Sequence, residues 1–128
     1  MSQKFNDLIA VFLIQLVFTL PFISADAYGL VISEVRANKI TENSASIEWK
    51  TDVPANGTAR YGKTSKLGQS QKHIDFISAH SLPVVGLSSN TEFFFSVESY
   101  DSSGNFASDD NSGSFYKFKT LGGSQDKE

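Results

Sequence analysis

An eight-residue segment of this sequence matches the pattern of a phosphate-binding loop. Residues 57–64 read GTARYGKT, a glycine followed by four residues and then Gly-Lys-Thr. Such a loop binds phosphate because it follows a buried strand and opens a helix, whose N-terminal amides surround the anion. Here residues 52–57 (DVPANG) are predicted as a turn by their Pro and Asn-Gly content, and residues 65–72 are too polar for a core helix. We therefore interpret the segment as a strand with its turn, and not as a nucleotide site.

Two further patterns could carry chemistry, and both are incomplete. Residues 114–117 (SFYK) fit the Ser-x-x-Lys signature of a serine nucleophile, but the companion Ser-Asp-Asn and Lys-Thr-Gly motifs are missing. The two histidines, His73 and His80, have no acidic residue at metal-ligand spacing, and a zinc site needs at least three protein ligands. His80 is expected to cap the start of a strand. We predict no catalytic site, cofactor or metal, and expect that the protein is not an enzyme.

A loop after residue 100 is rich in the oxygen ligands that calcium prefers. Asp101, Asp109, Asp110 and Asn111 lie within it, but the ordered Asp-x-Asp-x-Asp-Gly spacing of a calcium loop is absent. We interpret these side chains as solvated turn residues. Asn56-Gly57-Thr58 is an acceptor sequence for N-glycosylation, which matters only in a host that glycosylates.

The side chains of residues 91–101 alternate between two faces of a predicted strand. Phe93, Phe95 and Val97 point to one face, which predicts a buried core. Phe94 and Tyr100 point to the other face, and exposed aromatic residues can mark a surface that binds a partner or a sugar. The alternative is that they are isolated surface aromatics, which are common and need no function.

Seven short strands separated by turns are predicted, the pattern of an all-β sandwich. The clearest alternation lies in residues 45–51, where Ile47 and Trp49 face inward. The strands are expected at residues 30–37, 45–51, 58–61, 71–76, 79–85, 91–101 and 115–120. The predicted structural core consists of Trp49, Tyr61, Leu87, Phe93, Phe95 and Val97.

The N-terminal segment has the features of a secretory signal peptide. Residues 8–23 (LIAVFLIQLVFTLPFI) are almost continuously apolar, Lys4 precedes them, and Ala25-Asp26-Ala27 is a small-residue cleavage site. We predict cleavage after Ala27. The alternative is an uncleaved membrane anchor through residues 8–23, although a spanning helix needs about 20 apolar residues.

Composition excludes several classes of partner and site. Without residues 1–27 the chain keeps 10 basic and 12 acidic residues, a net charge of −2, so it has no strong field for nucleic acid. There is no cysteine, which excludes disulfides, thiolate metal ligands and a cysteine nucleophile. A domain is expected at residues 28–120. Residues 121–128 (LGGSQDKE) are expected to form a flexible polar tail.

The order of motifs across residues 32–120 resembles a fibronectin type III domain, a seven-stranded immunoglobulin-like β-sandwich. The resemblance is greatest to bacterial and archaeal members and to the domain associated with purple acid phosphatases. It rests on Trp49, on Ala59-Arg60-Tyr61-Gly62, on Leu87, Thr91 and Phe93, on Asp101, Gly104 and Asn105, and on Phe118-Lys119-Thr120.

Two residues depart from the family pattern. Ser89 replaces a common proline, and Phe93 replaces the corner tyrosine whose hydroxyl bonds back to the backbone. The missing hydrogen bond is worth about 1 kcal/mol net. The family's Arg-Gly-Asp adhesion motif is absent as well.

The resemblance implies an exported, non-catalytic binding or spacer module at or outside the cell surface. Its partner would be another extracellular protein or a glycan, with no nucleic acid, and with a membrane only if the N-terminal helix is uncleaved. An alternative is an accessory domain, for example a carbohydrate- or substrate-binding one, of an extracellular hydrolase such as a metallophosphatase, whose catalytic domain would not be in this chain.

Overall fold

The computed structural model describes residues 29–124, and these residues form strands without a helix. Among them, no helix is long and apolar enough to cross a membrane. The predicted signal peptide or anchor of residues 1–27 lies outside the described residues, as do the last four residues. The strands are β1 (Ile32–Asn38), β2 (Ser44–Gly62), β3 (Gln69–Val85), β4 (Glu92–Tyr100), β5 (Phe106–Asp109) and β6 (Tyr116–Lys119).

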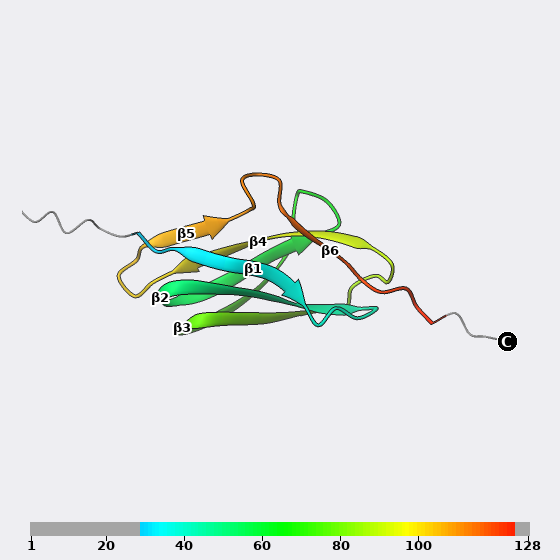
Figure 1. The fold of residues 1–128 in the computed structure, drawn as a ribbon, viewed down its shortest axis with the longest axis horizontal. Helices are drawn as coiled ribbons and strands as arrows, with labels where there is room; N and C mark the ends of the chain where they lie inside the picture. The colour runs from blue at the N-terminus through cyan, green and yellow to red at the C-terminus, as the bar shows by residue number, and fades with distance from the viewer. Residues whose placement is uncertain (1–28, 125–128) are drawn as a thin grey trace, which may run out of the picture.

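Two long strands, β2 and β3, pass from one layer of the fold to the other. In the first layer, residues 44–50 of β2 pair with β1 on one side and with residues 79–85 of β3 on the other. In the second layer, residues 57–61 of β2 pair with residues 69–73 of β3, and residues 58–62 pair with β4. All neighbouring strands are antiparallel. The curled sheet thereby closes into the predicted fibronectin type III-like sandwich (Figure 1).

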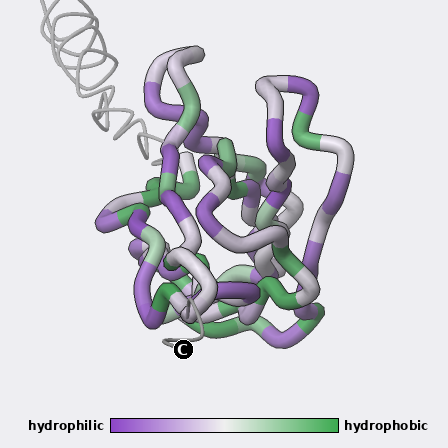
Figure 2. The backbone as a smooth tube through the Cα atoms, turned by 90° about the vertical axis from the view of Figure 1, so that its right-hand side faces the viewer, coloured by the Kyte–Doolittle hydropathy of each residue, from purple (hydrophilic) through white to green (hydrophobic). Residues whose placement is uncertain are grey.

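The second layer is completed by two short strands that share β4 as their neighbour. β5 pairs with the end of β4, and β6 pairs with its beginning. The first and last described residues lie at opposite ends of the molecule (Figure 1). Hydrophobic and hydrophilic residues alternate along the backbone (Figure 2), as expected for strands with one face on a core.

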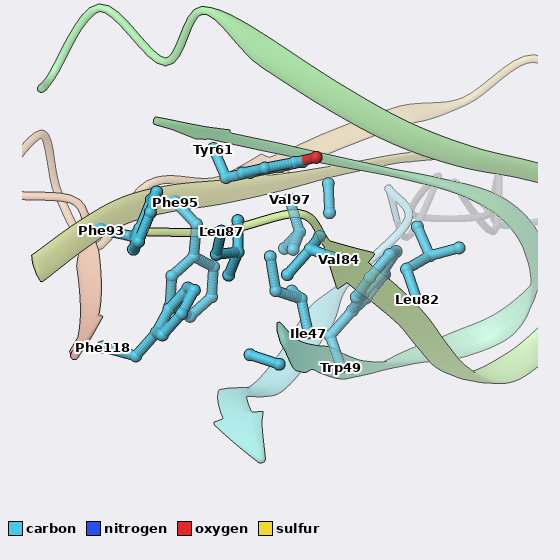
Figure 3. Close-up of a cluster of buried hydrophobic side chains, with 12 residues drawn as sticks. Ile47, Trp49, Tyr61, Leu82, Val84, Leu87, Phe93, Phe95, Val97 and Phe118 are labelled. Atoms are coloured by element: carbon cyan, nitrogen blue, oxygen red, sulfur yellow. The ribbon is translucent and has the colours of Figure 1, made fainter. Parts of the chain in front are cut away.

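The core fills the space between the layers (Figure 3). Phe93, Phe95 and Phe118 gather at one end, and Trp49 lies at the other. Phe93 stacks on Phe118 with ring centroids 5.5 Å apart, so the ring that replaces the corner tyrosine still packs. All six residues of the predicted core are buried: Trp49, Tyr61, Leu87, Phe93, Phe95 and Val97.

Several predicted boundaries are wrong. Residues 52–57, predicted as a turn, continue β2 in an extended conformation, because the strand bends between layers instead of reversing. The predicted strands at 71–76 and 79–85 are likewise one strand, β3. The predicted strand at 115–120 is reduced to β6, and β5 forms inside the segment that was expected to be only a loop.

Candidate functional site

The most exposed aromatic pair of the second layer lies at the end of β4. Tyr100 pairs with Phe106 of β5, and their ring centroids are 4.7 Å apart. The two residues are 47% and 49% exposed, so about half of each remains open to solvent. Tyr100 therefore lies on the outer face, as the alternation indicates. Phe106 is not among the predicted site residues, and the β4–β5 pairing brings it to this position.

The turn between Tyr100 and Phe106 is held by one carboxylate. Asp101 accepts hydrogen bonds from the backbone N–H groups of Ser103 and Asn105, both 2.9 Å, and from the Asn105 amide at 2.7 Å. The hydrogen bond from the Asn105 side chain is the main cause that lowers the pKa of Asp101. Asn56 of β2 accepts a hydrogen bond from the backbone N–H of Tyr100 at 3.0 Å. Tyr100 and Phe106 therefore lie at the two ends of a turn that these hydrogen bonds hold in one conformation.

Phe94, the other residue of the predicted partner surface, lies at the opposite end of β4 and is half-buried. The ammonium group of Lys117 on β6 lies over its ring, 4.8 Å from the centroid. The same ammonium group is 3.8 Å from Glu92. Phe94 and Tyr100 thus share an outer face but do not form one continuous patch, since they are separated along β4 and Phe94 is already covered by a cation.

A second cluster, which we call the histidine corner, consists of Trp49, Thr51, Gly57, His73 and His80. It lies where β2 and β3 cross between the layers. His80 stacks on Trp49 with centroids 4.6 Å apart and an interplanar angle of 7°, and His73 stacks on His80 at 5.0 Å. His80 is only 3% exposed and lies inside β3, so the prediction that it caps the start of a strand is wrong.

The imidazoles of the histidine corner are linked in one chain of hydrogen bonds. Nε2 of His73 is 2.8 Å from Nδ1 of His80, Nε2 of His80 is 3.1 Å from the Thr51 hydroxyl, and that hydroxyl donates to the Ile77 carbonyl at 3.4 Å. With the hydroxyl proton directed at the Ile77 carbonyl, His80 donates from Nε2 and His73 donates to Nδ1 of His80. In this arrangement Nδ1 of His73 carries no proton, and within residues 29–124 this buried atom has no hydrogen-bond partner.

Burial holds His80 in its neutral form. Desolvation is the larger cause and the neighbouring His73 the smaller, and together they lower the pKa of His80 from 6.5 to about 4. The charged groups on the outer side of this region are already paired. Lys50 binds Glu34 and Arg36 binds Glu48, each at 2.9 Å, around a cavity of about 210 Å³ that His80 also lines.

The indole of Trp49 anchors the histidine corner to β4. Its Nε1–H donates to the hydroxyl of Ser99 at 3.1 Å, and both side chains are buried. Ser99 has no exposed surface, so a neutral buried hydrogen bond explains why a polar residue occupies this core position.

Ser99→Ala is expected to lower the free energy of unfolding by about 1–2 kcal/mol, because the indole N–H would be left buried without an acceptor. Denaturant unfolding followed by circular dichroism measures this cost. In a Trp49→Phe background the same substitution is expected to cost much less, since no indole donor remains. An equal cost in both backgrounds would show that the hydrogen bond contributes nothing.

The remaining sequence motifs lie in strands and turns of the fold. Residues 57–62 lie in β2 and residues 63–64 in the following turn, so the Gly-Lys-Thr segment opens no helix. The Ser-x-x-Lys segment runs into β6. Tyr116 donates from its hydroxyl to Asp109 at 2.9 Å, and burial, followed by that hydrogen bond, raises the pKa of Tyr116 to about 12. Among the described residues, no group of three or more His, Cys, Asp or Glu side chains is placed to hold a metal.

Solved structures share this fold. A myokine structure superposes with a TM-score of 0.58 at 17% identity, over 71% of this chain and 96% of that chain. The sensor domain of the anti-sigma factor RsgI4 from Pseudobacteroides cellulosolvens gives 0.55 at 24% identity, over 77% and 96%. The fibronectin type III domain of the human collagen α-1(XX) chain gives 0.54 at 17% identity, over 80% and 95%. No protein-family model and no curated protein matches the sequence.

Proposed function

We propose that this protein is an exported, non-catalytic, fibronectin type III-like module that binds another extracellular protein through Tyr100 and Phe106. The single observation that carries the proposal is the contact between these two rings at the end of β4, each with about half of its surface open to solvent. Tyrosine and other aromatic residues are enriched among the few residues that dominate binding energy at interfaces.

The constraint on the pair favours binding. Asp101 fixes the turn that joins the two aromatic residues, and Asn56 ties the backbone of Tyr100 to β2. A surface that is already ordered loses less conformational entropy when a partner docks. The rings therefore present apolar area together with the Tyr100 hydroxyl at a small ordering cost.

Export and the absence of catalysis rest on other features. Export is supported by the apolar residues 8–23 and the Ala25-Asp26-Ala27 site. The structural neighbours named above include a sensor domain and a fibronectin type III domain, and neither name states a catalytic activity. A finer relation to the domain associated with purple acid phosphatases stays a prediction from the sequence, as does an accessory role beside a hydrolase. Turnover of sugar, peptide or phosphate-ester substrates by the purified protein would contradict the non-catalytic part.

Tyr100→Ala and Phe106→Ala are each expected to weaken partner binding about 10-fold or more, because each removes an exposed aromatic anchor. The measurement is capture of proteins from extracellular and cell-surface fractions, in parallel with a glycan array, followed by titration of the captured partner. Phe76→Ala is the matched control, since Phe76 is also 49% exposed but lies on β3.

Phe94→Ala is expected to have the smaller effect, because Lys117 already covers that ring. Partners that bind all variants equally would refute the role of the Tyr100–Phe106 pair. If the protein binds only on the glycan array, and both substitutions abolish that binding, the Tyr100–Phe106 surface is the binding site but its partner is a glycan and not a protein.

A further inference from the structure

A cleft of about 450 Å³ opens beside the start of β4, at the other end of that strand from Tyr100. One wall is the turn that joins β2 to β3, and the other is the segment that joins β3 to β4. Its volume falls within the range of about 300–1,000 Å³ that is usual for small-molecule sites. The cleft includes the Gly-Lys-Thr segment that has no role in the proposed function.

The lining of the cleft combines positive charge, neutral polar groups and an apolar base. Lys63 and Lys66 supply the charge, and neither makes an ion pair within residues 29–124. The lining residues include no aspartate or glutamate, although the whole chain carries a net charge of −3. Leu87 and Phe93 lie at the base, but they are only 7% and 3% exposed and belong to the core, so they offer little surface to a ligand. The neutral polar side chains are those of Thr64, Gln69 and Ser88.

The wall that carries the lysines is ordered by local hydrogen bonds. The backbone N–H of Leu67 donates to the Thr64 carbonyl at 3.1 Å, and the backbone N–H of Lys66 lies 3.3 Å from the Thr64 hydroxyl. Gly62 closes the turn, since a Cβ atom there would lie 3.0 Å from the backbone nitrogen of Gly68. The turn therefore places the backbone of both lysines on one rim of the cleft.

The opposite wall is tied to distant parts of the chain. The backbone N–H of Leu87 donates to the Asn43 carbonyl at 2.9 Å, and the Thr120 hydroxyl donates to the Ser88 carbonyl at 2.6 Å. Both walls are thus fixed without a ligand, as is usual for a binding site that is preformed.

We propose that this cleft binds a uronate, that is, a sugar ring that carries a carboxylate. The ammonium groups of Lys63 and Lys66 form charge-assisted hydrogen bonds with the carboxylate. The hydroxyls of Thr64 and Ser88 and the amide of Gln69 pair with the sugar hydroxyls. Inorganic phosphate would use the lysines but is too small to reach all three neutral polar side chains of both walls at once. The site is separate from the Tyr100–Phe106 surface, so either can fail alone.

The test is a titration of the ¹⁵N-labelled protein, with amide chemical shifts as the measurement. The probes are glucuronate, a hyaluronan tetrasaccharide, neutral chitotetraose and inorganic phosphate, at constant ionic strength. We expect saturable shifts of amides in residues 62–69 and 86–88 with both uronate probes. Tighter binding of the tetrasaccharide would assign the ligand to a polysaccharide, and equal binding would assign it to the free sugar acid.

Lys63→Gln combined with Lys66→Gln is expected to weaken uronate binding at least about 10-fold, because both charge-assisted bonds are lost. Lys72→Gln, which neutralises an exposed lysine of β3 outside the cleft, is expected to leave binding unchanged. Three results would each overturn the proposal: no shift in the cleft amides, equal binding of chitotetraose, or equal binding of phosphate.

Discussion

Acidification from about pH 7 to about pH 4 is expected to lower the free energy of unfolding by about 2–3 kcal/mol through His80 alone. Burial, and to a smaller extent the neighbouring His73, lowers the pKa of His80 from 6.5 to about 4 in the folded protein. Between these two values the unfolded chain binds a proton that the folded chain does not. Stability is therefore complete above pH 6.5 and is lost progressively as the pH falls towards 4.

The hydrogen bonds of the histidine corner also predict that the protein loses stability when His80 is protonated. Nδ1 of His80 accepts a hydrogen bond from Nε2–H of His73. When His80 binds a proton at Nδ1, His73 loses that acceptor. To accept a hydrogen bond from His80, His73 would have to carry its own proton on its Nδ1 atom instead of its Nε2 atom. Nδ1 of His73 is buried and has no partner among the described residues. Either arrangement leaves a buried polar group unsatisfied, which is costly.

His80→Gln is the matched variant, because glutamine is polar and does not titrate. Denaturant unfolding at a series of pH values is expected to show a shallower loss of stability for this variant than for the wild type between about pH 6.5 and about pH 4. The carboxylates, including Asp101, are common to both proteins and cancel in the comparison. Identical slopes for the two proteins would refute the assignment to His80, whatever the absolute stability of the variant.

Side-chain alternation was sufficient to predict most of the core. It places Ile47 and Trp49 of β2 on one face, and the structure buries both. It also separates Phe95 from Tyr100 on β4, one buried and the other exposed. Local alternation works here because these segments have regular pairing with their neighbours, so a period of two is preserved.

The histidine corner could not be predicted, because it depends on a change of register. His73 and His80 are seven residues apart, and regular alternation would place them on opposite faces of β3. The β2–β3 pairing shifts between Lys50 and Ala55 and again between Ala55 and Gly57, which turns both imidazoles to the same side. Such a shift inside paired strands leaves no clear mark on the sequence. The pairing of Phe106 with Tyr100 was not predicted either, because β5 has only four residues.

Gly57→Ala is expected to destabilise the fold by about 3 kcal/mol, at the upper end of the usual cost of overpacking a core. A Cβ atom at this position would lie 2.5 Å from Cζ2 of Trp49, 2.7 Å from Nε2 of His73 and 3.0 Å from Nδ1 of His80. Two of these three rings are held in place by hydrogen bonds. The Trp49 indole is hydrogen-bonded to the Ser99 hydroxyl, and the His80 imidazole is hydrogen-bonded to the Thr51 hydroxyl. The glycine is required here because the indole and the imidazole pair occupy the space of a side chain.

The change in stability is measured by denaturant unfolding followed by the fluorescence of Trp49, the sole tryptophan of the chain. Gly68→Ala is the control, because a Cβ atom there meets nothing within 4 Å, and it is expected to change stability by less than about 1 kcal/mol. Gly57→Ala must also separate His73 from His80 to make room, so its stability should depend less on pH than that of the wild type. A Gly57→Ala protein with wild-type stability and wild-type pH dependence would show that the histidine corner is not closely packed around Gly57.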